Sequence, residues 1–180
     1  MKKFIFVIFV YLTVAMSATA KADDLTFERI SDYLHWSHHD TRFIPKYEKK
    51  AAELIPALLH WSEVYNPHKD GIDFPLLVAC LWYKESSWRN FKGARGELGP
   101  GQVMPGKWVQ HDLSTLDGQI AESIRQLSEA VNNCDTMIGV FTWYAYGGGT
   151  CVPRTEKTRM KMRHRENYYR NAFEMFGVSR

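Results

Sequence analysis

The chain has 180 residues, of which 45% are hydrophobic and 14% aromatic, and a formal net charge of +3. This length and composition fit one compact domain with a hydrophobic core, and they exclude an intrinsically disordered chain. Strand patterns are nearly absent and helical periodicity recurs, so the predicted fold class is mainly α.

The first 22 residues, MKKFIFVIFVYLTVAMSATAKA, combine two lysines, an apolar stretch and a small-residue end. This order predicts a secretory signal peptide, with an uncleaved membrane anchor as the alternative; the apolar run is short for a span of about 20 residues. Cleavage after Ala22 removes three lysines and no acid, which takes the net charge to zero. We expect a signal peptide over 1–22 and one domain over 23–180, exported to the periplasm or the extracellular space.

The chain contains three cysteines, and an exported protein meets an oxidising compartment. Cys134 and Cys151 are separated by one short predicted helix and a glycine turn, so we expect them to form a disulfide. A loop of this length would stabilise the fold by about 3 kcal/mol. Cys80 lies inside an apolar run and is predicted to be a buried thiol, although other pairings stay open.

Hydrophobic stripes at helical spacing recur along the mature chain. The second stretch should break near Pro56, because proline lacks the amide that an inner turn requires. In the third, Asp73 is the expected N-cap and Pro75 falls in the first turn. The expected helices cover 27–40, 45–65, 73–88, 117–133 and 135–147, followed by a last helix that carries Met162, Tyr169, Phe173 and Phe176.

The segment 91–108, FKGARGELGPGQVMPGKW, holds five glycines and two prolines and cannot form a regular helix. We expect an irregular loop or a small β-hairpin there, which is where functional sites tend to lie on a helical frame.

Two polar clusters have ordinary interpretations that we favour. His35 and His39 are spaced to bind a metal together with Asp40, but no further ligand motif accompanies them. The basic residues of 152–180 suit a polyanion, yet such a run is more often the solvated face of a helix. We therefore expect no metal, no cofactor and no nucleic-acid partner.

Glu85 closes an almost wholly apolar run. Val78, Trp82 and Glu85 share one helix face, and the run is apolar all round, as in a buried helix. Burial at its end favours a neutral carboxylic acid, which is the form that a general acid for glycosidic cleavage requires. The alternative is an ordinary solvated glutamate at a helix end.

The segment GELGPGQVMP follows Glu85 in the loop. Its glycines allow close backbone approach, and Gln102 offers one amide as donor and acceptor. Sugars with N-acetyl groups need neutral hydrogen-bond partners of this kind. Trp108 and other aromatic residues offer flat faces for sugar rings, although most aromatics in a domain of this size belong to the core.

Three segments, KESSW, GELGPGQVMP and WYAYGGG, resemble in order and spacing the motifs of the lytic transglycosylase domain of the soluble-transglycosylase type, a relative of goose-type lysozyme. The resemblance covers 70–149. It implies a lysozyme-like helical domain that cleaves the bond between N-acetylmuramic acid and N-acetylglucosamine in peptidoglycan, leaving a 1,6-anhydro end. Its partner would be the glycan strand, in wall turnover or in a secretion, conjugation or phage apparatus, and we expect a monomer.

By this resemblance Glu85 is the catalytic acid and base. The residues that match substrate-binding or loop positions of the family are Ser86, Gly99, Gln102, Val103, Met104, Tyr144 and, on the last helix, Tyr168. The chain departs from the family pattern at Pro100-Gly101, at Trp143 and Ala145, and at Gly148, which affects the fine contacts to the sugar.

Most glycoside hydrolases use two carboxylates, whereas this family uses one, because the muramic 6-hydroxyl supplies an internal nucleophile. Glu97 is the residue that would change this prediction. As a second carboxylate it would activate water and make the protein a muramidase; we favour a solvated loop charge. A non-catalytic glycan-binding or inhibitory module and a structural scaffold without glycan contact are the remaining alternatives.

Overall fold

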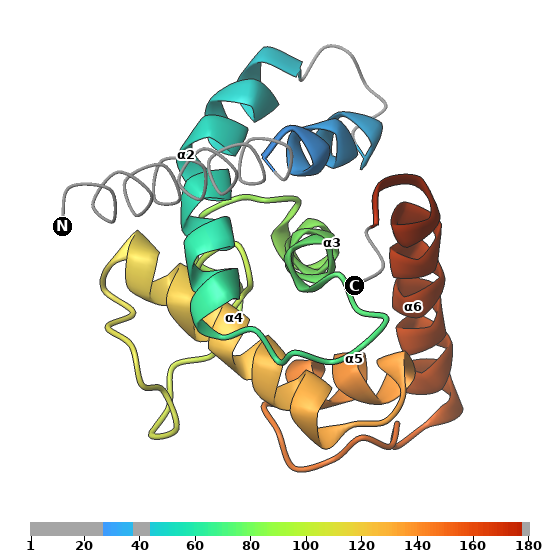
Figure 1. Cartoon of the computed structure of the whole chain (residues 1–180). Coiled ribbons are helices and arrows are strands. Elements are labelled where there is room, and N and C mark those ends of the chain that lie inside the picture. Colours follow the sequence, from blue (N-terminus) through green and yellow to red (C-terminus); the bar gives the residue numbers. More distant parts are fainter. Residues whose placement is uncertain (1–26, 38–43, 178–180) are drawn as a thin grey trace, which may run out of the picture.

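The computed structural model describes residues 27–37 and 44–177. Within these ranges the protein is mainly helical and contains no strand, which agrees with the predicted fold class. Figure 1 shows α3 near the middle of the molecule, viewed almost along its axis, with the other helices around it. The helices are 27–37, α2 Ile44–Val64, α3 Phe74–Ser86, α4 Leu116–Asn133, α5 Met137–Ala145 and α6 Glu156–Phe176.

Helix α3 forms the centre of the core and packs against α2 and α6. Asp73 caps its N-terminus by accepting a hydrogen bond from the Leu76 amide, and proline occupies the first turn, as predicted. The helix ends where Ser87 takes a left-handed conformation with φ 53°. Residues 76–82 are all buried, and each large side chain among them contributes about 2 kcal/mol by leaving water.

Helices α4 and α5 pack against each other, and α5 also packs on α6. The predicted stripe of α4 is confirmed: Ile120, Ile124, Leu127 and Val131 are all buried. Helix α5 ends two residues before Gly147, whose φ of +69° is a left-handed conformation that glycine adopts without strain.

The expected break at Pro56 is wrong, because α2 runs without interruption past this residue. Proline removes one backbone hydrogen bond, to the carbonyl of Ala52, and both residues lie on the exposed side of the helix. Water can satisfy that carbonyl. On the opposite side Ile55 and Leu58 are fully buried, so core packing holds the two halves of α2 together.

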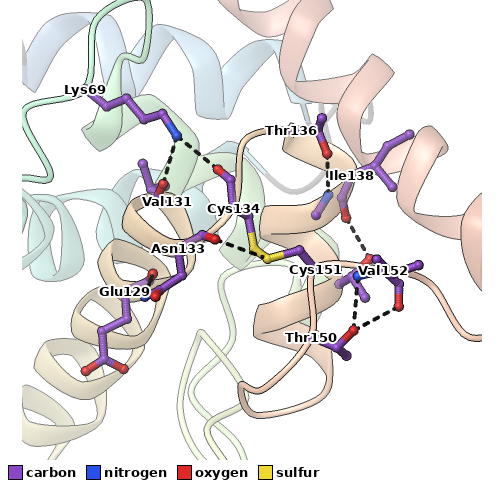
Figure 2. Close-up of a disulfide and its surroundings, with 12 residues drawn as sticks. Lys69, Glu129, Val131, Asn133, Cys134, Thr136, Ile138, Thr150, Cys151 and Val152 are labelled. Carbon is purple, nitrogen blue, oxygen red and sulfur yellow. Dashed lines mark hydrogen bonds between the residues drawn. A yellow bond between two sulfur atoms is a disulfide. The ribbon is translucent and has the colours of Figure 1, made fainter.

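The predicted disulfide between Cys134 and Cys151 is confirmed (Figure 2). It ties the end of α4 to the segment that leads into α6. Lys69 adds a further link, because its ammonium donates to the carbonyls of Val131 and Cys134 at 3.1 and 2.9 Å (Figure 2). Cys80 is a buried free thiol, also as predicted.

Some expectations fall on residues that the structure does not describe. The signal peptide over 1–22 lies outside the described residues, and so do His39 and Asp40 of the histidine cluster. In 27–37 and 44–177, no helix has the length and apolar character needed to cross a membrane.

Candidate active site

The glycine-rich loop between α3 and α4 is irregular. It contains two isolated antiparallel bridges, Lys92 with Leu98 and Leu98 with Val103, but no strand is formed in it. Leu98 and Val103 exchange two backbone hydrogen bonds of 2.9 Å, and the chain between them turns tightly. Of the two predicted alternatives, the irregular loop is the one observed, and a β-hairpin is not.

Three helices hold this loop in place. At the end of α3, the buried Ser86 hydroxyl donates to the Pro100 carbonyl at 2.7 Å. From α5, the Tyr144 hydroxyl donates to the Gly101 carbonyl at 2.7 Å. A Cβ atom at Gly101 would lie 2.8 Å from this hydroxyl and closer still to Ser123 of α4, so the close approach requires glycine.

The fixed loop, the ends of α3 and α5 and the sides of α4 and α6 line a cavity of about 500 Å³. Four of the predicted site residues line it: Glu85, Gln102, Met104 and Tyr144. Gln102 donates through its amide to the Gly99 carbonyl at 2.8 Å, which sets its position beside the cavity. Residues that are far apart in sequence therefore meet around the carboxylate of Glu85.

The other predicted residues lie elsewhere. Ser86, Gly99 and Val103 are buried in the frame of the loop and are not among the described residues that line the cavity. Tyr168 stacks on Tyr83, with ring centroids 5.3 Å apart, and its hydroxyl lies 3.1 Å from that of Tyr33. Tyr168 belongs to an aromatic cluster between α3, α6 and the helix 27–37, and in the described chain it is not part of the cavity wall.

The partner of Glu85 is Arg165 of α6. The Arg165 guanidinium donates to the Glu85 carboxylate, and the two side chains are 6% and 18% exposed. The surroundings of Glu85 are therefore not apolar alone, because the cavity also carries a cation in direct contact with its carboxylate. Arg165 shares one stripe of α6 with the buried Met162 and Tyr169, and an arginine on such a stripe is the sequence signal that indicates a buried ion pair.

Glu97 also lines the cavity, but it is not the solvated charge that we favoured. It is 8% exposed, and the Arg95 guanidinium and backbone amide donate to its carboxylate at 2.7 and 2.9 Å. Hydrogen bonds from its own backbone amide and then from Arg95 hold the pKa of Glu97 below its ordinary value, against the effect of burial. Glu97 is therefore a charged, anchored carboxylate.

Tyr144 forms an uncharged part of the wall. Burial, reinforced by the nearby negative charge of Glu85, raises the pKa of Tyr144 well above its ordinary value. Its hydroxyl thus stays protonated at neutral pH and keeps donating to the Gly101 carbonyl. The wall around Glu85 combines neutral hydrogen-bond donors with charged groups.

A second cavity of about 390 Å³ adjoins the first, because Trp108, Gln126, Tyr144 and Gly147 line both. Trp108 is 49% exposed, and Trp143 lines the second cavity. Two adjoining cavities with accessible indole rings offer room and flat apolar faces for more than one sugar ring.

A buried carboxylate of α4 helps to hold the segment that carries Trp108. Glu122 is fully buried. It accepts hydrogen bonds from the Arg125 guanidinium, the Gln126 side-chain amide and the Gln110 backbone amide. Burial opposes the charged form of Glu122, but these bonds outweigh it and leave the pKa of Glu122 below its ordinary value. Arg125 also donates to the Trp108 carbonyl.

Comparisons of the chain with protein-family models, with curated proteins and with solved structures gave no match. The likeness to lytic transglycosylases therefore depends on the three motifs noted in the sequence.

Proposed function

We propose that this protein is a peptidoglycan lytic transglycosylase that cleaves the β-1,4 bond between N-acetylmuramic acid and N-acetylglucosamine. The observation that carries the proposal is the shared cavity: Glu85, at the end of a buried helix, faces it together with Gln102 and Tyr144. These residues come from three separate motifs, and the motifs resemble those of one family.

In the proposed reaction Glu85 acts twice. As a carboxylic acid it gives its proton to the glycosidic oxygen, and the bond from this oxygen to the muramic anomeric carbon breaks. The 6-hydroxyl of the same muramic residue then attacks the anomeric carbon, and the Glu85 carboxylate takes the hydroxyl proton. The products are a free 4-hydroxyl and a 1,6-anhydro ring, so no water is consumed and Glu85 is restored.

The cavity wall supplies the positioning that an internal nucleophile requires. Gln102 and the loop backbone offer neutral hydrogen-bond partners for N-acetyl groups, and the exposed ring of Trp108 offers a stacking face. An internal attack succeeds when the reacting atoms are held in line, which is why a single carboxylate can suffice.

Purified cell walls provide the direct test of activity. Wild-type protein should lower the turbidity of a wall suspension, and Glu85→Gln should be slower by a factor of about 10² to 10⁴, the usual contribution of a positioned acid. Glu174→Gln is the matched control, because Glu174 is an exposed carboxylate on α6. Equal clearing by wild type and Glu85→Gln would refute the proposal.

A hydrolytic muramidase is the second candidate, and the position of Glu97 favours it. Glu97 is charged and lines the same cavity as Glu85, as a base that activates water would. Under this alternative Glu97→Gln abolishes cleavage. Under the transglycosylase proposal Glu97→Gln retains most activity, because Glu97 then serves only to anchor Arg95 and the loop.

The cellular setting is part of the proposal. A signal peptide over 1–22 would export the protein to the compartment where peptidoglycan lies, and the Cys134–Cys151 disulfide suits an oxidising environment. Fractionation of cells that express the full chain, with mass measurement of the exported protein, tests export and cleavage after Ala22.

A further inference from the structure

The ion pair of Glu85 points to a ligand group that the cleavage reaction itself does not specify. We propose that the cavity binds a carboxylate of the glycan strand on Arg165 and Lys161, an inference that rests on the proposed function. We further propose that this anion takes the place of Glu85 as the partner of Arg165, which leaves Glu85 available as the proton donor.

Arg165 is the reason that an anion is needed. The Arg165 side chain is 6% exposed, and among the described residues its ion-pair partner is Glu85. When Glu85 carries the proton that an acid must carry, the guanidinium loses its counter-charge while it remains buried, which is costly. A second anion at Arg165 removes this cost, so binding of the anion and protonation of Glu85 favour each other.

Lys161 adds a second positive charge to the part of the cavity wall that carries Arg165, so Glu85 alone does not neutralise it. It lies one helical turn before Arg165 on α6 and lines the same cavity, and within the described residues it has no ion-pair partner. Lys84 of α3 lies outside the cavity, because its ammonium sits 3.7 Å from the centre of the Tyr168 ring. The charge of Arg95, in contrast, is already neutralised by Glu97.

The chemistry of the substrate narrows the choice of anion. Muramic acid carries a lactyl ether on the sugar whose anomeric carbon would react, and its carboxylate is free in strands that lack peptides. In strands that carry peptides the lactyl group is an amide, and the nearest carboxylates belong to the peptide. Chitin oligomers carry no carboxylate. The proposed ligand is thus a substrate carboxylate, and these two sources can be told apart.

Binding to the Glu85→Gln variant separates the anion site from catalysis, because glutamine mimics the neutral acid but cannot donate a proton to the glycosidic oxygen. The probes are a tetrasaccharide of alternating N-acetylglucosamine and N-acetylmuramic acid with free lactyl groups, the same compound with lactyl methylamides, its peptide-bearing form, and chitotetraose. Calorimetry should show the free acid or the peptide form binding about tenfold more tightly than the methylamide, the effect of one charge-assisted hydrogen bond.

Two further changes locate the effect in the Glu85→Gln background. Lys161→Gln should reduce the ratio of affinities for acid and methylamide severalfold, and Arg165→Gln should bring it near one. Arg163→Gln is the matched control, because Arg163 is an exposed cation of the same helix that does not line the cavity. Lys161 is also exposed, so its replacement should not impair folding.

The ratio of affinities decides the matter, since a general loss of folded protein affects both ligands equally. A preference for the free acid assigns the site to the lactyl carboxylate, and a preference for the peptide form assigns it to the peptide. Equal binding of all four probes, or a preference unchanged in both Lys161→Gln and Arg165→Gln, would overturn the inference. Wall clearing by the wild type is measured separately, so a failure of the proposed activity is recognised on its own.

Discussion

The Arg165 guanidinium donates to the Glu85 carboxylate and so joins two helices across 80 positions of the sequence. Glu85 ends the central helix α3, and Arg165 lies halfway along α6. The pair therefore links the core of the domain to its last helix at the edge of the cavity.

Replacing Arg165 by methionine should lower the free energy of unfolding by about 2 kcal/mol. The loss should be smaller than for a fully buried pair, because Glu85 is 18% exposed and water can still reach its carboxylate. Urea unfolding of Arg165→Met beside Arg163→Met, which changes an exposed arginine, measures the difference. A loss no larger than that of Arg163→Met would show that the pair does not stabilise the fold.

Removing the Tyr144 hydroxyl should loosen the loop that bears Gln102. Tyr144→Phe loses the 2.7 Å bond to the Gly101 carbonyl, which should cost about 1 kcal/mol of stability. We also expect a lower kcat/KM on wall substrates, since Gln102 is displaced with the loop. Tyr146→Phe is the matched control, because in the described chain the Tyr146 hydroxyl contacts the Thr158 hydroxyl at an exposed position rather than the loop. If both variants behave alike, Tyr144 does not position the loop.

Glu122 should contribute to the loss of stability in acid. Its pKa is below the ordinary value of 4.5 in the folded protein, so the folded state binds fewer protons than the unfolded one. The stabilisation by Glu122 is therefore complete above the unfolded pKa and disappears as the pH falls through the lower, folded pKa. Thermal unfolding of Glu122→Gln at pH 3 to 7 should show a shallower acid decline than wild type. An unchanged slope would contradict this assignment.

The two kinds of cysteine should behave differently toward reagents. Burial raises the pKa of Cys80 to about 12, so its thiol should react with a maleimide only after unfolding. Breaking the Cys134–Cys151 bond by a double serine replacement should lower stability by about 3 kcal/mol. Thiol counting in native and denatured protein, with unfolding curves of the serine variant, tests both statements. A reactive thiol in the native oxidised protein would contradict the first statement, and an unfolding curve of the serine variant that matches wild type would contradict the second.

Local sequence patterns predicted the helical frame well. Asp73 and Pro75 mark the start of α3, and the stripe from Ile120 to Val131 marks the buried face of α4. These features depend on neighbours in the chain. The break at Pro56 was wrong because tertiary packing of Ile55 and Leu58 outweighs one missing hydrogen bond on an exposed face.

The candidate site could be predicted only in part, because some of its contacts depend on tertiary packing rather than on neighbours in the chain. Glu85, Gln102 and Tyr144 lie in motifs, and the structure brings them to one cavity. The pairing of Arg165 with Glu85 depends on how α6 packs on α3, which a local pattern does not contain. The burial of Glu97 likewise follows from the turn that brings Arg95 onto its carboxylate.

Mass spectrometry of the glycan fragments released from purified peptidoglycan tests the central proposal most directly. Wild-type protein should release muropeptides with 1,6-anhydro ends. In the proposed reaction the Glu85 carboxylate takes the proton of the muramic 6-hydroxyl, and this hydroxyl attacks the anomeric carbon in place of water. Glu85→Gln should release them more slowly by a factor of about 10² to 10⁴. Fragments with reducing ends, or anhydro fragments released by Glu85→Gln as fast as by wild type, would contradict the account.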